Sequence, residues 1–319
     1  YLREAQLPER MDEIPEGMFF KCARLSAVYF PLKVESIGGF VIHGTPYYSQ
    51  FYDYAIVNTF LLGYNGAAPM DSIPSFVTHI ADGAFSQRVA IAEEITITYK
   101  TNCLFEKAVI PADVSLGENL FCDNPAIKEV VFEDGTQTVP DGTFNGCENL
   151  VSVTVPDSVT CIGKDAFMKS NLESIELPKS VTSIGWRAFF NCTSLQRIVV
   201  PSAIERIEDS TFYGCKSLTE VVLPSALKEI GTRVFAHCKA LKTMVLPSSL
   251  EDIGEKAFDN CPLESVFFDG TEAEFLSVSV AEGNDSFLNA AVYFYSETEP
   301  TENPQKFWRF SGGKPLPWA

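Results

Sequence analysis

A pattern of 23 residues is written three times between Cys192 and Asn260, and it restricts the possible folds more than any other feature of the sequence. Each copy opens on a cysteine. Leucine follows at offset three, an aliphatic residue or methionine at six, valine or leucine at eight, proline at nine and phenylalanine at twenty. A fixed period of this length predicts a solenoid in which each copy forms one coil and neighbouring coils bury a shared core.

The offsets also predict the structure of one coil. In the copy that starts at Cys215, Val221 and Leu223 alternate along a short strand and point to the same side. Pro224 ends that strand because proline has no N–H to give to a ladder. The remainder of the copy is too short for an ordinary helix and indicates turns, with room for one helical turn. Stacking would repeat each residue at the strand spacing of roughly 4.7 to 4.9 Å.

The repeated string C-x-x-L-x-x-I/V-x-L-P, followed by x-x-L-x-x-I-G-x-x-A-F, resembles the BspA-like leucine-rich repeats of surface and secreted proteins. Such proteins occur in bacteria and some protozoa. The resemblance implies a right-handed solenoid of about 23-residue coils. It also implies a parallel β-sheet on the concave face and short helical turns or loops on the convex face. The function it implies is adhesion or binding rather than catalysis.

We expect the solenoid to span residues 1–270. The string that begins at Ile14, IPEGMFFKCARLSAVYFP, aligns without a gap on VPDGTFNGCENLVSVTVP, which begins at Val139. The chain itself is expected to start inside a coil, as a protein trimmed after a signal peptide or cut from a longer one. Offsets three, six, eight and nine of that first coil are filled by Leu2, Ala5, Leu7 and Pro8.

Two stretches depart from the period. Residues 39–72 are rich in Tyr and Phe, and we interpret them as diverged coils whose aromatic side chains fill the core. An exposed aromatic loop that contacts a ligand is the alternative, since exposed aromatic residues commonly anchor interfaces. Residues 87–97 fit no coil position, which predicts an insertion or bulge.

Residues 271–319 are expected to cap the last coil, since a solenoid needs its terminal coil covered. Thr271 and Glu274 have the spacing of a capping box at the start of a short helix. The segment NAAVYFYS indicates a strand, and FWRFSGGKPLPWA indicates an aromatic hairpin with SGG as its turn. An alternative role for this end is a sugar-binding platform made by Trp308 and Trp318.

The composition suits a secreted or surface-attached protein. The formal net charge is −18 and the pI is about 4.6, which argues against nucleic acid and anionic membranes as partners because both require a basic patch. No segment reaches the 18 or more apolar residues of a membrane-spanning helix. Together with the resemblance, this predicts an extracellular or cell-surface location.

The cysteines are expected to be mainly buried thiols. Their number, nine, makes complete internal pairing impossible, although stacked cysteines could approach disulfide distance. Cys122 and Cys161 lie off the ladder position and are predicted to be more exposed. No C-x-x-C pair suggests zinc. Seven cysteines share the core-facing ladder position, where a thiol behaves as a small apolar group: Cys22, Cys103, Cys147, Cys192, Cys215, Cys238 and Cys261.

Residues suited to catalysis are few, and we predict no enzyme activity and no cofactor. The chain has three histidines. His79 occupies a turn position, His237 precedes Cys238 so that their side chains should diverge, and the role of His43 is open. No nucleophile elbow, zinc-protease motif, phosphate-binding loop or dinucleotide fingerprint occurs.

The predicted sheet instead offers a binding surface. The residue at offset seven of each coil should face outward, and five of the eight clear examples are Val or Phe. An exposed apolar column can mark a binding site, although β-branched residues also simply suit strands. The column comprises Tyr29, Val131, Thr154, Glu176, Val199, Val222, Val245 and Phe267.

The function predicted from this surface is adhesion to a host or neighbouring-cell protein or glycoprotein. A structural spacer without a ligand of its own is the first alternative. Carbohydrate recognition by the C-terminal tryptophans is the second. Because unrelated functions share one fold, the sequence does not identify the partner.

Overall fold

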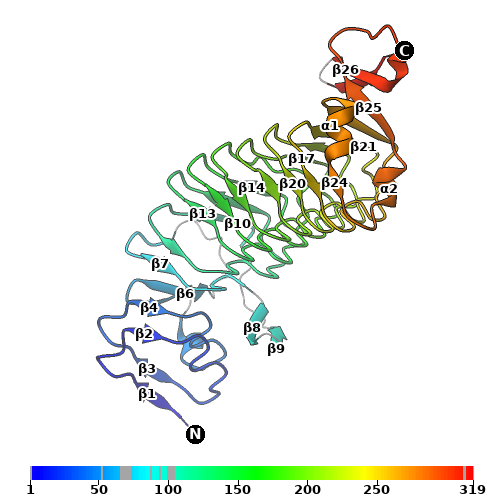
Figure 1. Cartoon of the computed structure of the whole chain (residues 1–319). Coiled ribbons are helices and arrows are strands. Elements are labelled where there is room, and N and C mark those ends of the chain that lie inside the picture. Colours follow the sequence, from blue (N-terminus) through cyan, green and yellow to red (C-terminus); the bar gives the residue numbers. More distant parts are fainter. Residues whose placement is uncertain are drawn as a thin grey trace. The chain divides into compact units, whose positions relative to one another are not determined.

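The protein is a parallel β-solenoid of about 11 turns with roughly 23-residue spacing and little helix. A computed structural model describes residues 2–51, 53–64, 73–86, 88–92, 95–98, 105–311 and 314–318, with the backbone alone at 88–92 and 95–98. The chain divides into two compact units, Tyr1–Pro156 (unit 1) and Asp157–Ala319 (unit 2). Figure 1 shows the repeated coils within each unit.

Most coils of unit 1 carry two short strands, of which the second was not predicted from the sequence. The first strands are β1 (Glu4–Gln6), β3 (Ala27–Tyr29), β10 (Lys107–Ile110), β12 (Glu129–Phe132) and β14 (Ser152–Thr154). The second strands are β2 (Glu13–Ile14), β4 (Ser36–Ile37), β7 (His79–Ile80), β11 (Ser115–Leu116) and β13 (Thr138–Val139). Strands of one kind pair in parallel, as β1 does with β3 and β2 with β4. We call these two surfaces the first-strand wall and the second-strand wall.

Two antiparallel hairpins interrupt the coils of unit 1. β8 (Arg88–Ala92) and β9 (Ile95–Thr98) form one, which confirms an insertion near residues 87–97. β5 (Tyr54–Val57) and β6 (Phe60–Tyr64) form the other, and β6 also pairs in parallel with β7. The described part of residues 39–72 therefore contains a hairpin, which the prediction of diverged coils did not include.

The aromatic residues around this second hairpin enter the core, as the sequence predicted. Phe40, Tyr48, Phe60 and Tyr64 are buried, and Tyr48 begins a 3-10 turn, η1 (Tyr48–Gln50). Residues 65–72, which belong to the same irregular stretch, lie outside the described residues.

Unit 2 continues the two-strand pattern. First strands are β17 (Arg197–Val199), β19 (Glu220–Val222), β21 (Thr243–Pro247) and β23 (Ser265–Asp269). Second strands are β15 (Cys161–Ile162), β16 (Ser183–Ile184), β18 (Arg206–Ile207), β20 (Glu229–Ile230), β22 (Asp252–Ile253) and β24 (Ser279–Val280). β17 pairs in parallel with β19 and β21 with β23, so equivalent residues of neighbouring coils lie side by side.

A ladder of phenylalanines forms the centre of unit 2. Phe189, Phe212, Phe235 and Phe258 are fully buried, with ring centroids 5.5 to 5.7 Å apart in successive pairs. Phe287 continues the ladder from the cap, 5.3 Å from Phe258. The phenylalanine at offset twenty is thus the main core residue of each coil.

The ladder cysteines are buried thiols that bond to the backbone. The Cys215 thiol donates to the Phe189 carbonyl at 3.2 Å and the Cys238 thiol to the Phe212 carbonyl at 3.2 Å. Burial raises the pKa of the Cys192 thiol to about 12. Cys147, Cys192, Cys215, Cys238 and Cys261 are buried thiols outside any disulfide, and Cys103 lies outside the described residues.

One prediction about the thiols was wrong. Cys122 is buried, because it follows Phe121 in a coil where Asn124 takes the ladder position. The Asn124 side chain donates to the Phe85 carbonyl at 2.9 Å, as a ladder thiol would. Cys161 is partly exposed, as expected, and so is the ladder residue Cys22.

Turns, rather than helices, return the described regular coils to the next strand. Arg233 and His237 both have positive φ (56° and 62°), and the same i, i+4 pattern recurs at Ser210 with Gly214. We call the surface made by these turns, such as Ser210–Gly214 and Arg233–His237, the turn wall. Its N–H groups at Ser210, Phe212 and Gly214 donate to carbonyls of the following coil at 2.8 to 3.1 Å. The backbone N–H groups of these turns are therefore satisfied without a helix, so the described regular coils have non-helical turns where short helical turns or loops were predicted.

The C-terminal segment covers the last coil. It comprises α1 (Glu272–Ser277), α2 (Asp285–Leu288), β25 (Ala291–Tyr295), η2 (Pro304–Lys306), β26 (Phe307–Ser311) and β27 (Lys314–Pro317). The Thr271–Glu274 capping box and the antiparallel β26–β27 hairpin are both confirmed, while the Gly-Gly turn lies outside the described residues.

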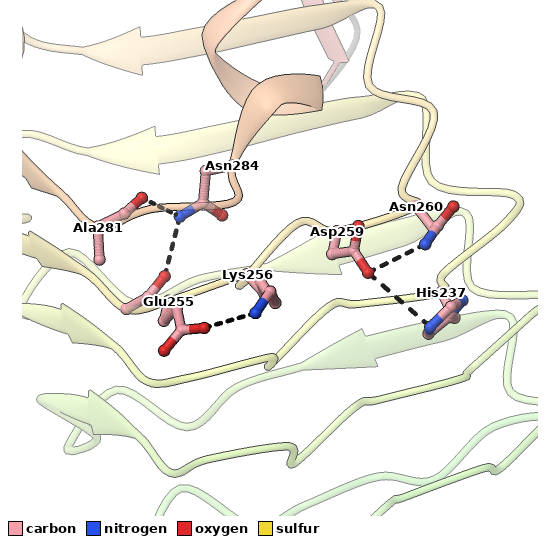
Figure 2. Close-up of polar contacts among 8 residues, drawn as sticks. His237, Glu255, Lys256, Asp259, Asn260, Ala281 and Asn284 are labelled. Atoms are coloured by element: carbon pink, nitrogen blue, oxygen red, sulfur yellow. Dashed lines mark hydrogen bonds and ion pairs between the residues drawn. The ribbon is translucent and has the colours of Figure 1, made fainter.

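Asn284, at the start of α2, ties this segment to the last coil. Its side-chain nitrogen donates to the Ala281 carbonyl at 2.8 Å (Figure 2) and to the Gly254 carbonyl at 2.9 Å. Its side-chain oxygen accepts from the Phe258 N–H at 3.0 Å.

Candidate binding surface

The first-strand wall of unit 2 presents part of the predicted apolar column to solvent. Val199 in β17 and Val222 in β19 lie opposite each other in the parallel register, and each has 40% of its surface exposed. Val245 in the neighbouring β21 is half-buried. Their sequence neighbours Ile198, Val221 and Met244 point inward and are buried. The alternation of the strand therefore produces a short apolar stripe on the outside.

Charged side chains flank this stripe. Arg197 Nε lies 2.9 Å from Glu220 Oε1, and Lys242 Nζ lies 2.6 Å from Glu264 Oε1. Both ion pairs join neighbouring coils and are largely exposed, so each contributes about 0–1 kcal/mol to stability. Glu173 and Glu176, in the coil before Arg197, are exposed and have no ion-pair partner among the described residues. The wall is thus apolar along one column and charged along the next.

Phe267 does not belong to the exposed column. Its ring is buried, stacked on Tyr293 at 5.1 Å and edge-on to Trp308 at 5.6 Å. Placing it on the surface was an error, because the C-terminal hairpin covers this end of the wall. The exposed stripe therefore ends at Val245.

The C-terminal tryptophans do not form an open platform. Trp308 is fully buried and its Nε1 donates to the Phe268 carbonyl at 3.0 Å, which contradicts its proposed role in sugar binding. The Arg309 guanidinium lies 3.8 Å from the ring centroid of Trp318, whose Nε1 donates to the Ser296 carbonyl at 3.3 Å. The Trp308 ring therefore packs on β23 of the last coil, and the Trp318 ring packs within the C-terminal segment.

The column residues of unit 1 form a less apolar surface. Tyr29 in β3 is 57% exposed. Val131 in β12 is half-buried and lies opposite the exposed Thr154 in β14. Val109 in β10, 38% exposed, lies opposite Val131 and forms a second apolar pair. Because Val131 is half-buried whereas Val199 and Val222 are each 40% exposed, the stripe in unit 2 is the stronger candidate for a contact.

The histidines have no catalytic arrangement. Burial lowers the pKa of His43 to about 3, and its ring stacks on Tyr48 at 4.2 Å. His79 lies in β7 rather than in a turn and stacks on Phe60 at 4.5 Å. His237 is partly exposed, 4.0 Å from Asp259 (Figure 2), whereas the adjacent Cys238 is buried. These two side chains therefore diverge, as predicted.

Within the described ranges, no group of three or more His, Cys, Asp or Glu residues has the geometry to hold a metal ion. The same residues include no helix that is long and apolar enough to cross a membrane.

One exposed aromatic residue was missed by the sequence analysis. Trp186 is 41% exposed on the turn wall of unit 2, with Lys164 Nζ and Arg187 Cζ each 4.9 Å from its ring centroid. The Arg187 Nε also lies 3.2 Å from Asp165. Trp186 follows the repeat glycine Gly185, at a position where the residue type differs from coil to coil. The repeat pattern therefore makes no prediction for it.

Comparison with known proteins establishes the family. The model of the BspA type leucine-rich repeat region, in six copies, matches residues 1–58, 70–170, 114–226 and 160–278. The chain belongs to the BspA type leucine-rich repeat family. BspA type repeats are typically non-catalytic scaffolds for protein interaction.

The chain is also similar to solved leucine-rich repeat proteins. One from Bacteroides ovatus is 23% identical over 93% of this chain and 79% of its own, with a TM-score of 0.52, which supports the fold. A leucine-rich repeat protein of T. pallidum is 22% identical over 67% of this chain and 87% of its own, with a TM-score of 0.42. A leucine-rich cell surface protein of Faecalibacterium prausnitzii is 21% identical over 88% and 91%, with a TM-score of 0.37. No curated protein matches the sequence.

Proposed function

We propose that this BspA type repeat protein is a non-catalytic adhesion module, secreted or held on a cell surface. It binds a protein or glycoprotein of a host or neighbouring cell through the first-strand wall. The observation that carries the proposal is the stripe of Val199 and Val222, each 40% exposed, beside a column of charged residues on the same wall. Valine side chains on a rigid sheet supply contact area at a smaller ordering cost than long, flexible side chains do.

The proposed location rests on the family and on composition. The family resemblance is to surface and secreted proteins, and the net charge of −18 favours solubility outside the cell over binding to nucleic acid or anionic lipid. A spacer that displays another part of a longer protein is the alternative function. A spacer of this kind should retain no binding partner on any of its surfaces.

The test is capture of purified extracellular-matrix proteins and mucin on the immobilised chain. The double variant Val199→Glu/Val222→Glu should lose the captured protein, because charges replace the apolar contact. The control is Thr182→Glu/Ala203→Glu, which places the same two charges at exposed positions of unit 2 away from the stripe. Equal capture by native chain and stripe variant would rule out the first-strand wall, and no capture by any form would favour the spacer.

A further inference from the structure

We infer that the first-strand wall of unit 2 docks on the same wall of a second copy of this chain, with the coils in opposite order. The inference rests on the proposed function, because it names the partner of that same surface. The observation behind it is the order of outward charges along four consecutive coils: Glu173, Arg197, Glu220 and Lys242. Arg197 and Glu220 share one offset of the coil, and Glu173 and Lys242 share the offset before it. The sign of the outward charge alternates from coil to coil, and the coil of Glu173 carries a second exposed carboxylate, Glu176.

An alternating row with an even number of charges is complementary to itself when it is reversed. A two-fold axis along the strand direction, between β17 and β19, reverses the order of the coils. It brings Arg197 of one copy over Glu220 of the other and Glu173 over Lys242. It also brings Val199 over Val222 and Glu176 over Val245, so the apolar contact is made by the two exposed valines of each copy. Such a contact is isologous and closed, because each pair occurs twice.

Other alignments of the two copies are disfavoured, either because like charges meet or because the facing residue is covered. An axis through the coil of Val222 places Glu220 opposite its own counterpart, and an axis through the coil of Val199 does the same to Arg197. An axis one coil further along places Val199 over Phe267, which the C-terminal hairpin covers. Juxtaposed like charges are unfavourable and set the register of many interfaces. One register therefore joins the stripes and pairs the charges at once.

The in-chain ion pairs do not block this arrangement. The Lys242 ammonium has three donors and can bond to Glu264 of its own chain and to a facing Glu173 together. The Arg197 guanidinium, which lies 2.9 Å from Glu220 of its own chain, has five donors. Both cations are more than half exposed, so further acceptors can reach them.

The contact should be weak for one pair of molecules. Four coils at about 4.8 Å span less than roughly 20 Å, and strands of this length span about 10–15 Å. The buried area is then far below the roughly 800 Å² per partner of a standard interface. Many copies on each of two surfaces would multiply a weak contact into firm attachment. Homophilic adhesion between surfaces that carry this protein is the expected outcome.

The test uses beads densely coated with the chain through its C-terminus, which amplifies weak contacts. Native beads should clump. Beads with Glu173→Lys alone, or with Lys242→Glu alone, should clump at least about threefold less, because each variant places like charges opposite each other. A mixture of the two variant beads in different colours should clump again. In the mixture both end charges of the row are positive on one bead type and negative on the other, so opposite charges face each other at both ends.

The matched control is Lys228→Glu on the second-strand wall. It removes an exposed inter-coil ion pair of the same kind, Lys228 with Glu205 at 2.7 Å, and should leave clumping unchanged. Circular dichroism and thermal melting establish that each variant is folded. Native beads that stay dispersed, or variant beads that fail to restore clumping when mixed, would overturn the inference. If another protein is captured through Val199 and Val222 while native beads stay dispersed, the proposed function stands and only the identity of the partner is wrong.

Discussion

Replacement of Phe235 by alanine should be one of the most damaging single changes in this protein. Its ring is fully buried between Phe212 and Phe258, at centroid distances of 5.7 and 5.5 Å and interplanar angles of 5° and 20°. Loss of a buried phenylalanine side chain typically costs about 3–5 kcal/mol, which includes the cavity left behind. Because each coil of a solenoid contacts only its neighbours, this one cavity weakens two coil interfaces. We therefore expect a loss in the upper part of that range, about 4–5 kcal/mol.

The measurement is equilibrium unfolding in urea, followed by far-ultraviolet circular dichroism and by tryptophan fluorescence. Coincident transitions would justify a single free energy of unfolding. Phe235→Leu, which keeps most of the apolar volume, should cost about 1–2 kcal/mol. Val222→Ala, at an exposed site on the outside of β19, should change stability by no more than about 0.5 kcal/mol. A loss below about 1 kcal/mol for Phe235→Ala, similar to that of Val222→Ala, would show that the ladder is not the core.

Two further changes test the packing of the coils. Gly254→Ala should lower the urea midpoint by an amount equivalent to about 1–3 kcal/mol, since a β-carbon there would lie 2.6 Å from the Gly231 carbonyl carbon and 2.7 Å from the Thr232 nitrogen; an unchanged midpoint would mean that these coils can separate freely. Stability should also fall as pH rises above 9, because burial keeps the pKa of Cys192 near 12 while the unfolded thiol releases its proton near 9. The urea midpoint should accordingly be lower at about pH 10 than at about pH 8. Cys192→Ala should show a smaller difference between the two pH values than the native chain, and an equal difference would contradict a buried thiol.

The period of the sequence was sufficient to predict the inward half of each coil. Offsets that hold leucine, cysteine and phenylalanine in every copy correspond to buried residues such as Leu218, Cys215 and Phe235. The glycine of the I-G pair also has a physical reason, because at Gly254 the preceding coil leaves no room for a β-carbon. Residues under one steric constraint in every coil repeat, and repetition is what a single sequence reveals.

Features that depend on the backbone alone were not predictable in this way. The second strands contain only two residues, such as Arg206–Ile207, which is too short for an alternating pattern to show. The left-handed position two residues before the ladder phenylalanine holds glycine at Gly83 and Gly142 but arginine or lysine at Arg187, Arg233 and Lys256, so no consistent residue type marks it. Hydrogen bonds between coils stabilise this conformation, and those bonds involve main-chain atoms that every residue has.

The candidate site was predicted only where it is regular. Val199 and Val222 are exposed as their offset implies, because only neighbouring coils surround them. Phe267 has the same offset but is covered by Trp308, which lies far along the chain and outside the repeat. A contact between a repeat and a non-repeating segment leaves no trace in the period.

Stability and binding are separable in this protein because they occupy alternate residues of the same strands. Ile198 is buried, and its replacement would disturb folding and binding together. Val199 points outward, and its replacement changes the surface while leaving the Phe and Cys ladders intact. The same holds for Arg197 and Glu220, whose exposed ion pair adds little to stability. The solenoid therefore does not require the alternation of charge along the wall, and a variant that melts like the native chain but no longer binds would trace the function to those outward residues alone.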